Sequence, residues 1–404
     1  MKTELLGAEG LDRAAALIKS GELVAVPTET VYGLACNGLN ADAVAEVYEV
    51  KGRPEQKPLS LMVHKGESIE RYCVSVPAQA KALAEKFWPG PLTIVLNAKT
   101  DIVPDIVRAG GETVALRCPD HPLTQRLLEK AGLPFAAPSA NPSGEKSPIT
   151  ARQVMDYFDG KISAVVDGGE CGIGKESTII DMSRTPFKVL RKGALPEGDI
   201  AEALSQKLTV IGITGGTGCG KTTALNVLRD MGVLIIDCDA LYHEMLLSNA
   251  EMLHGIAGAF PGTVNGGVLD RRALADAVFS DKEKLEKLNA ITHHYVTAEI
   301  DDRLRDWAMQ GGTAAAVDAI AIIEGGIASR CSATVAVVAE KETRISRIMR
   351  RDNITRAEAE SRVAAQKPNE FFEANCGCVL HNDGSETEFI DQCKILFKEV
   401  LKNE

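Results

Sequence analysis

Eight consecutive residues near the middle of the chain have the types and spacing of a loop that binds phosphate. They are Gly215, Gly216, Thr217, Gly218, Cys219, Gly220, Lys221 and Thr222, which fit G-x-x-x-x-G-K-[ST]. The glycines allow backbone N–H groups to face an anion, and a following helix would add partial positive charge. We expect Lys221 to reach the β- and γ-phosphates of ATP and the Thr222 hydroxyl to bind Mg²⁺. Thr223 belongs to the same predicted ATP-binding segment.

The residues on either side support this prediction. The apolar run 208–214 is expected to be a buried strand, and residues 223–231 have apolar side chains at helical spacing. A strand, a loop and a helix in this order are the context that the motif requires. The alternative, a glycine-rich turn that fits by chance, does not account for that context.

Two carboxylates follow the next predicted strand, residues 233–236. Asp237 and Asp239 are two positions apart, so on an extended chain their side chains would face the same way. At the carboxyl end of a parallel strand, one can hold Mg²⁺ through water and the other can accept the proton of a hydroxyl nucleophile. A polar strand end without a function is the alternative.

Residues 315–324 are predicted to form a buried strand. A cationic helix face is predicted after another apolar strand, residues 334–339. Arg347, Arg350 and Arg351 share one face of that helix, and no acidic residue lies between Thr343 and Arg351. Such a face above the phosphate loop would form a lid that supplies charge to a transferring phosphoryl group. The alternative is a solvated charged face.

The first half of the chain carries polar segments next to its predicted elements. Residues 27–34 follow a short predicted strand, residues 51–54 end a predicted helix, and residues 137–144 form a loop rich in Ser, Asn and Gly. Such a loop offers hydroxyl, amide and backbone donors that suit an anion or a nucleotide. Taken singly, each segment also fits an ordinary strand edge, helix end or turn.

Together these segments resemble the YrdC family, the L-threonylcarbamoyladenylate synthases. The resemblance extends from about residue 11 to residue 191 and rests on the segments 28–34, 51–54, 57–59, 88–93, 139–144 and 177–178, in that order. It implies that threonine, bicarbonate and ATP give threonylcarbamoyl-AMP and pyrophosphate, for threonylcarbamoyladenosine synthesis on tRNA. An RNA-binding module is the alternative for this half.

The resemblance also implies a set of site residues. Lys51 and Arg53 would hold the nucleotide phosphates together with Ser139 and Asn141, and Arg117 would lie near the threonine carboxylate. The other residues implied to line this site are Thr28, Thr30, Tyr32, Lys57, Ser177 and Arg191. Mg²⁺ is expected with ATP.

The second half resembles dephospho-CoA kinase from about residue 208 to residue 398. The resemblance rests on the phosphate loop, Asp237-x-Asp239 with His243, residues 269–271, the arginine-rich helix, Gln366 and residues 382–385. It implies transfer of the ATP γ-phosphoryl group to the 3′-hydroxyl of dephospho-CoA, the last step of CoA biosynthesis. Asp239 would be the base, Asp237 would assist Mg²⁺, Arg347 and Arg351 would come from the lid, and Asn382 would contact ATP. Another small-molecule kinase of this fold is the alternative.

Two departures from the kinase pattern concern the acceptor side. Residues 320–326 replace a Pro-Leu-Leu-Phe-Glu-like segment, although Glu324 still matches, and His294 stands where proline is usual. They leave the contacts with the pantetheine chain of the acceptor open.

Composition and charge limit the other possibilities. A chain of 404 residues is long enough for two or three domains, and its net charge of −11 argues against a broad nucleic-acid surface. The sequence shows no signal-like segment and no apolar run of membrane length, and its ten cysteines suit a reducing cytoplasm. Cys376, Cys378 and His381 offer three ligands where a structural zinc site needs four.

We therefore expect an α/β protein with two catalytic domains. Residues 1–200 would form a YrdC-like domain with a twisted mixed sheet and flanking helices, and residues 201–207 a short linker. Residues 208–404 would form a phosphate-loop kinase with a parallel sheet and a helical substrate and lid region. The expected partners are ATP, L-threonine, bicarbonate and dephospho-CoA, with tRNA-modification proteins as further candidates.

Overall fold

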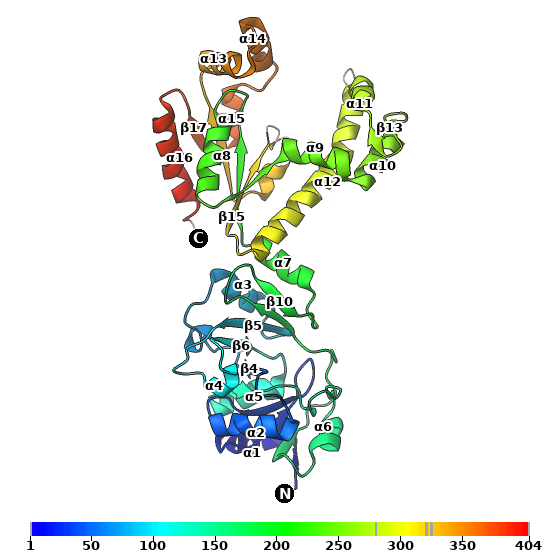
Figure 1. Cartoon of the computed structure of the whole chain (residues 1–404), viewed down its shortest axis with the longest axis vertical. Helices are drawn as coiled ribbons and strands as arrows, with labels where there is room; N and C mark the ends of the chain where they lie inside the picture. Colours follow the sequence, from blue (N-terminus) through cyan, green and yellow to red (C-terminus); the bar gives the residue numbers. More distant parts are fainter. Residues whose placement is uncertain (1, 279–280, 320–321, 324–325, 403–404) are drawn as a thin grey trace. The chain divides into compact units, whose positions relative to one another are not determined.

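The computed structural model describes residues 2–278, 281–319, 322–323 and 326–402. The chain divides into two compact units, Met1–Lys207 with Met309–Gly311, and Leu208–Ala308 with Gly312–Glu404 (Figure 1). Glu324 and most of the segment that departs from the kinase pattern lie outside the described residues. Among the helices of the described ranges, none is both long and apolar enough to cross a membrane.

The first unit is built on a mixed sheet, as the sequence predicted. Its described strands form one ten-stranded sheet in the order β1-β8-β2-β3-β7-β4-β6-β5-β9-β10, with both parallel and antiparallel neighbours. The strands are β1 Glu4–Leu6, β2 Val24–Val26, β3 Gly33–Asn37, β4 Ser60–Met62, β5 Leu92–Asn97, β6 Thr113–Arg117, β7 Phe135–Ala136, β8 Ala164–Val166, β9 Thr178–Asp181 and β10 Lys188–Arg191.

Helices flank this sheet. They are α1 Leu11–Lys19, α2 Ala41–Lys51, α3 Ala78–Phe87, α4 Asp105–Arg108, α5 Pro122–Ala131, α6 Ala151–Phe158 and α7 Glu197–Ser205, with short 3₁₀ segments at Ala8–Gly10 and Ile69–Arg71. The side chain of Asn40 caps α2 by accepting from the N–H groups of Asp42 and Ala43. Gly52 ends the same helix in the left-handed conformation, at φ +57°. These two ends place Lys51 on the last turn of α2.

The second unit contains an all-parallel sheet, which also confirms the predicted fold. Its five strands are ordered β12-β15-β11-β16-β17 within the described residues. They are β11 Thr209–Thr214, β12 Leu234–Asp237, β15 Ala314–Asp318, β16 Ala333–Val338 and β17 Cys378–His381; a separate hairpin pairs β13 Val264–Asn265 with β14 Val268–Leu269.

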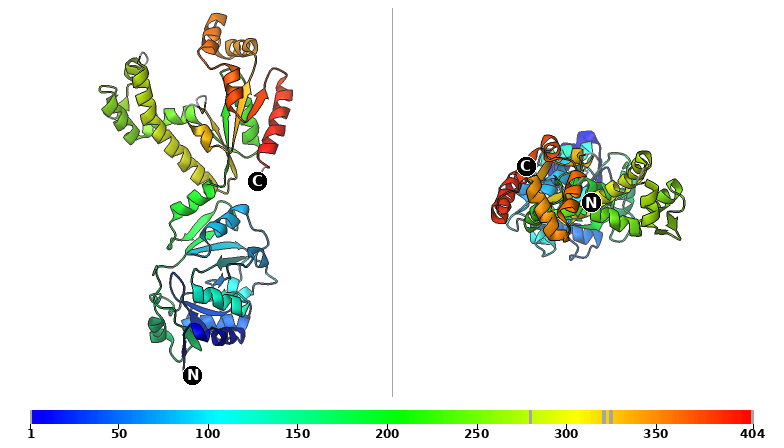
Figure 2. Two further views of the ribbon diagram at one scale, coloured as in Figure 1. Left: turned by 180° about the vertical axis from the view of Figure 1, so that it is seen from behind. Right: turned by 90° about the horizontal axis from the view of Figure 1, so that it is seen from above.

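The helices of the second unit surround the sheet and extend beyond it, and α13 and α14 lie past one of its ends (Figure 1). The helix α16 lies along one side of the sheet, and helices from α9 to α12 form an arm on the other side (Figures 1 and 2). The helices are α8 Lys221–Asp230, α9 Cys238–Ser248, α10 Ala250–Ala259, α11 Arg271–Val278, α12 Lys282–Met309, α13 Lys341–Asp352, α14 Arg356–Ala364, α15 Asn369–Asn375 and α16 Glu386–Val400, with a 3₁₀ segment at Ile327–Arg330.

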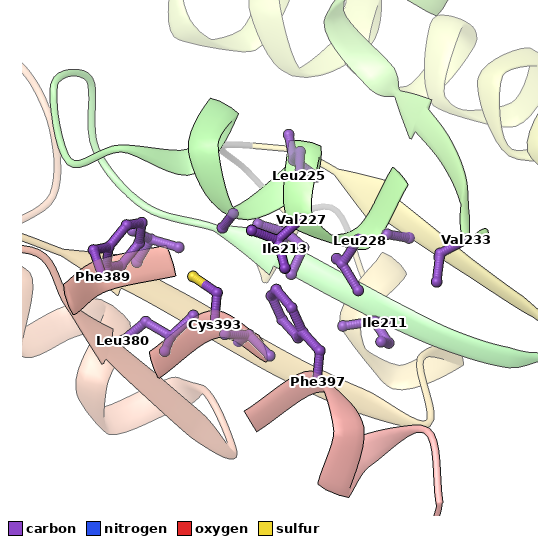
Figure 3. Packing of buried hydrophobic residues seen from close by; sticks show 14 of the residues in the cluster. Ile211, Ile213, Leu225, Val227, Leu228, Val233, Leu380, Phe389, Cys393 and Phe397 are labelled. Atoms are coloured by element: carbon purple, nitrogen blue, oxygen red, sulfur yellow. The ribbon is translucent and has the colours of Figure 1, made fainter. Parts of the chain in front are cut away.

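The core beneath the phosphate loop is made by α8, α16 and β11. Leu228 of α8 and Phe397 of α16 are fully buried against Ile211 of β11 (Figure 3). Burial of side chains of this size contributes about 1.5–3 kcal/mol each relative to exposure. Helix α8, which follows the phosphate loop, is therefore held against the central strand.

Two local expectations differ from the structure. The strand before the two carboxylates ends at Asp237, and Asp239 lies in the first turn of α9 because the Asp237 side chain caps that helix. The strand expected over residues 315–324 is shorter and ends at Asp318. Residues 201–205 of the predicted linker form the second half of α7, whose side chains Ile200, Ala203 and Leu204 are buried.

Candidate active sites

A cavity of about 450 Å³ lies at the phosphate loop of the second unit. The loop connects β11 to α8, so its residues stand at the carboxyl end of the central parallel strand. Six loop residues and three arginines of α13 line the cavity: Gly216, Thr217, Gly218, Gly220, Lys221, Thr222, Arg347, Arg350 and Arg351. A glycine-rich loop that faces several guanidinium groups suits a polyphosphate.

The cations of this cavity are held in different ways. Arg347 donates to the carbonyl oxygen of Asn382 at 2.9 Å and to its Oδ1 at 3.2 Å. Arg351 is paired with its neighbour Asp352, with Nε 2.7 Å from Oδ1. Asn382 is itself fixed to the phosphate loop, because its Nδ2 donates to the Cys219 carbonyl at 2.9 Å. The predicted lid helix thus contacts the loop through Asn382.

The phosphate-loop lysine has a carboxylate partner that the sequence reading missed. Lys221 Nζ lies 2.8 Å from Oδ1 of Asp318, and both side chains are largely buried. Burial raises the pKa of Asp318, while Lys221 lowers it and the nearby Asp237 and Asp239 raise it further. Asp318 is the register partner of Asp237 on the adjacent strand. The carboxylates of Asp237 and Asp318 therefore lie at the carboxyl ends of two adjacent parallel strands.

Asp237 and Asp239 have separate roles in the local structure. Asp237 Oδ1 accepts from the N–H groups of Asp239 and Ala240 at 3.0 Å each, and so begins α9. Asp239 instead lines a second cavity of about 350 Å³. Five further residues that line this cavity belong to α9 and α12: Cys238, Tyr242, Leu288, His293 and Val296. A carboxylate at the wall of a largely apolar cavity suits an acceptor with a hydroxyl group and an apolar portion.

The first unit places Lys51 inside a loop. Its Nζ donates to the carbonyl oxygens of both Ser139 and Asn141, and its own carbonyl accepts from Ser143 N–H at 2.8 Å. Burial, together with a smaller effect of charge repulsion from Arg53, lowers the pKa of Lys51 to about 7. Three of the four residues implied to hold phosphates are thus in direct contact.

Arg117 lies at the centre of a second contact group. Its Nη2 donates to Glu29 Oε1 and Thr30 Oγ1, each at 2.7 Å, and lies 3.5 Å from Thr28 Oγ1. Glu29 Oε2 also accepts from Asp120 N–H at 2.9 Å, so this carboxylate fixes the guanidinium. The structure therefore brings together Arg117 and both threonines of the predicted site.

Ser177, which directly precedes β9, contacts Arg191 at the end of the neighbouring strand β10. Arg191 donates to the Ser177 carbonyl at 2.9 Å and to its hydroxyl at 3.0 Å, and the same hydroxyl lies 2.8 Å from Thr93 Oγ1. Thr93 is the register partner of Arg117. Burial lowers the pKa of Arg191, and charge repulsion from Arg117 and Arg53 lowers it further. Several cations therefore gather in one region, which suits an anionic ligand.

The remaining predicted residues of the first unit differ in exposure. The Tyr32 hydroxyl donates to Gly169 O at 2.8 Å, and burial raises the pKa of Tyr32 to about 12. Arg53 donates to the main-chain carbonyls of Lys57 and Pro58. The Lys57 side chain is exposed, and it is the main-chain carbonyl of this residue that Arg53 contacts.

Three buried polar atoms lack a hydrogen-bond partner among the described residues. They are Arg117 Nε, Asn141 Oδ1 and His121 Nδ1. A buried polar atom without a partner is costly, so such atoms often mark the place of a ligand or a water. Two of them belong to predicted site residues. His121 was missed, because a single histidine carries no spacing signal.

The cysteine and histidine cluster near the end of the chain is not arranged as a metal site. Cys378 and His381 are three positions apart on β17, so their side chains point to opposite faces of the sheet. Over the residues that the structure covers, no group of three or more His, Cys, Asp or Glu side chains is placed to hold a metal ion.

Comparison with known proteins assigns the first unit to a family. The Sua5/YciO/YrdC family model, which carries the description "Telomere recombination", matches residues 16–193. A threonylcarbamoyl-AMP synthase of Halorhodospira halophila is 38% identical over 168 residues, which are 42% of this chain and 87% of that protein. The first half belongs to the Sua5/YciO/YrdC family.

A second relative is longer than the matched region. The threonylcarbamoyl-AMP synthase of Pyrococcus abyssi is 46% identical over 193 residues, which are 48% of this chain and 56% of that protein. The chain thus spans about half the length of this relative.

The second half carries a dephospho-CoA kinase domain. The dephospho-CoA kinase family model matches residues 209–388, which include the phosphate loop, both aspartates and Asn382. A solved dephospho-CoA kinase of Campylobacter jejuni is similar at 23% identity and a TM-score of 0.37, covering 48% of this chain and 98% of that one.

Proposed function

We propose that the chain is a bifunctional enzyme with one ATP site in each unit. Residues 1–200 would make threonylcarbamoyl-AMP and pyrophosphate from threonine, bicarbonate and ATP, and residues 208–404 would phosphorylate the 3′-hydroxyl of dephospho-CoA. The observation that carries the proposal is that each unit has its own cluster of cations at a loop. Lys51 and Arg53 belong to one cluster, and Lys221 and Arg347 to the other.

In the kinase, each of the two cavities would bind one of the two substrates. The phosphate loop and the α13 arginines bind the ATP phosphates, and Arg347, Arg350 and Arg351 offset charge on the transferring group. The acceptor occupies the cavity lined by Asp239, whose carboxylate accepts the proton of the attacking hydroxyl. The apolar wall of that cavity receives the uncharged part of the acceptor.

The donor atoms near the loop suit Mg²⁺. Thr222 offers a hydroxyl, and Asp237 and Asp318 offer carboxylate oxygens at the ends of adjacent strands. These are the hard oxygen ligands that Mg²⁺ prefers, and it usually keeps several waters. Bound Mg²⁺ would neutralise phosphate charge, and Asp237 Oδ1 would continue to cap α9. Asp318 is added here to the residues proposed from the sequence.

In the synthase, the contacts of Lys51 and Arg117 favour separate roles. Lys51 lies against the Ser139 and Asn141 carbonyls, which places a cation at the loop that would receive the phosphates. Arg117 is held by Glu29, and its Nε is left to bind the threonine carboxylate. Adenylation then needs alignment and charge neutralisation more than a covalent nucleophile. Arg191 and Ser177 would contact the nucleotide.

We extend the proposal to the setting of the two reactions. Both reactions would take place in the cytoplasm and would use ATP with Mg²⁺. The product of the synthase would pass to tRNA-modification proteins. The two reactions share ATP but no intermediate.

A product-resolved assay of the full chain tests both activities. One reaction contains threonine with bicarbonate, and another contains dephospho-CoA. We expect pyrophosphate in the first, and ADP with CoA in the second. Lys51→Ala should abolish only pyrophosphate release and Lys221→Ala only CoA formation, so each variant is the control for the other. The synthase assignment would be contradicted if the unaltered chain released no pyrophosphate but bound RNA, and if Lys51→Ala weakened that RNA binding.

A further inference from the structure

Three side chains form a closed set of hydrogen bonds at the apex of the phosphate loop. We call Thr217, Arg344 and Gln366 the apex cluster. Gln366 Oε1 accepts from Thr217 N–H at 2.8 Å and from Arg344 Nη2 at 2.7 Å. Gln366 Nε2 donates to Thr217 Oγ1 at 2.8 Å, and Arg344 Nε donates to Thr217 O at 3.0 Å. The N–H, carbonyl and hydroxyl of Thr217 thus all form hydrogen bonds with the other two members of the apex cluster.

The glycines beside Thr217 are explained by the same contact. The phosphate-loop pattern specifies Gly215 and Gly220 but leaves positions 216 and 218 open. A side chain on Gly216 would overlap the Arg344 guanidinium, and one on Gly218 would come within 2.8 Å of the Arg344 carbonyl. Gly218 also has φ +81°, which other residues rarely adopt. Helix α13 therefore packs directly against the loop.

Arg344 differs from the other arginines of α13. It is only 4% exposed, and its Nε and Nη2 bind protein atoms, whereas Arg347, Arg350 and Arg351 line the phosphate cavity. Arg344 is thus placed to act on the loop rather than on a phosphate. Gln366 follows α14, so the cluster joins the loop to both helices of the pair α13–α14.

We propose that Gln366 and Arg344 are positioning residues that hold the Thr217 peptide, and so keep the phosphate loop in the shape that binds nucleotide. This inference rests on the proposed ATP-dependent kinase activity of the second unit. Arg344 of α13 and Gln366, which follows α14, satisfy the hydrogen bonds of Thr217, while neighbouring loop residues line the cavity. Loss of the cluster would let the loop sample other shapes, and ordering it would then cost binding free energy.

The first test is the KM for ATP in CoA formation by the full chain. We expect Gln366→Ala to raise this KM about tenfold, as for the loss of hydrogen bonds that include a charged partner. The KM for dephospho-CoA should stay unchanged. Gln366→Glu should restore most of the affinity, since a carboxylate can accept from Arg344, from Thr217 N–H and from the Thr217 hydroxyl. Gln392→Ala, at an exposed position of α16, is the matched control.

The second test asks whether the two residues act as one unit. Arg344→Ala and the double variant with Gln366→Ala should show about the same KM for ATP as Gln366→Ala alone, because any one change already breaks the cluster. Arg350→Ala combined with Gln366→Ala should instead give an additive loss, since Arg350 is no member of the cluster.

ADP titration separates this inference from the proposed activity. Calorimetry measures the affinity of the full chain for ADP without any acceptor. The Lys221→Ala variant serves as the reference for ADP that binds outside the phosphate-loop site. Weaker ADP binding in Gln366→Ala, with the melting temperature kept, supports the cluster even if no CoA is formed. Unchanged ADP affinity with a lowered melting temperature would overturn it, since the residues would then be structural only. Additive losses from Arg344→Ala and Gln366→Ala would also overturn it.

Discussion

Lys221 and Asp318 form an ion pair at the phosphate loop, with Nζ 2.8 Å from Oδ1 and both side chains at most 15% exposed. The ammonium that we propose to bind phosphate is therefore balanced by a carboxylate. Binding of a polyphosphate would replace this partner, which leaves Asp318 free to bind Mg²⁺ or its water. The pair thus connects nucleotide binding with the proposed metal site.

Replacement of Asp318 by asparagine tests this connection. We expect Asp318→Asn to lower kcat for CoA formation by about ten- to a hundredfold, as is usual for residues that orient a metal or its waters. Higher Mg²⁺ should recover part of the activity. Asp391→Asn, on the exposed side of α16, is the control. A wild-type kcat at limiting Mg²⁺ would contradict the role of Asp318.

Asp239 offers a test of the base. We expect Asp239→Asn to reduce kcat for CoA formation by about 10²–10⁴, the usual contribution of general base catalysis. ADP binding should persist, because Asp239 lines the acceptor cavity and not the phosphate cavity. Stopped-time measurement of CoA, with ADP titration alongside, checks both points. Full activity of this variant would exclude Asp239 as the base.

Lys51 should make the stability of the first unit depend on pH. Its pKa falls to about 7 in the folded chain, mainly because of burial, from the ordinary lysine value of 10.5. Between these values the unfolded chain binds more protons than the folded chain, so this residue makes folding more stable as pH rises from about 7. Below about 7, Lys51 is protonated in both states and the folded chain carries a buried charge.

Hydrogen exchange of first-unit peptides, compared between pH 7 and pH 9, measures this effect. The unaltered chain should gain stability over that interval relative to Lys51→Met, in which the titrating group is removed. The exposed Lys57→Met serves as the control and should follow the unaltered chain. Equal pH dependence in Lys51→Met and the unaltered chain would show that Lys51 is not buried as described.

Arg117 can be tested through the threonine concentration dependence. Arg117→Lys keeps the charge but loses the planar group that binds a carboxylate through two N–H donors. We expect the KM for threonine to rise by about ten- to a hundredfold, while the KM for ATP changes little. Arg13→Lys, in an exposed ion pair with Glu4, is the matched control. A larger effect on ATP than on threonine would assign Arg117 to the nucleotide.

The sequence predicted the parts of the sites that are local in the chain. The phosphate loop is a run of neighbouring residues, so its pattern and flanking elements could be read directly. Asp318 could have been noticed as the polar end of an apolar strand, like Asp237. Its contact with Lys221, however, depends on β15 lying beside β11. The sequence of neither strand indicates which strand will lie beside it.

The roles of Arg344, Gln366 and Asp239 show the same limit. Gln366 was recognised only as part of a family pattern, because its partner Thr217 is 149 positions away. Asp239 was expected on an extended segment, but the Asp237 side chain satisfies two N–H groups and starts a helix there. In the first unit, the order of short segments indicated the site, whereas the Glu29 contact required the folded sheet.

The contacts of the phosphate loop also bear on how the chain matures during synthesis. Cys219 O binds Asn382, which is 163 positions later, and Thr217 binds Gln366. During synthesis the loop is therefore made well before the residues that bind it. A chain that stops before Asn382 would therefore lack the amide that binds the Cys219 carbonyl of the loop.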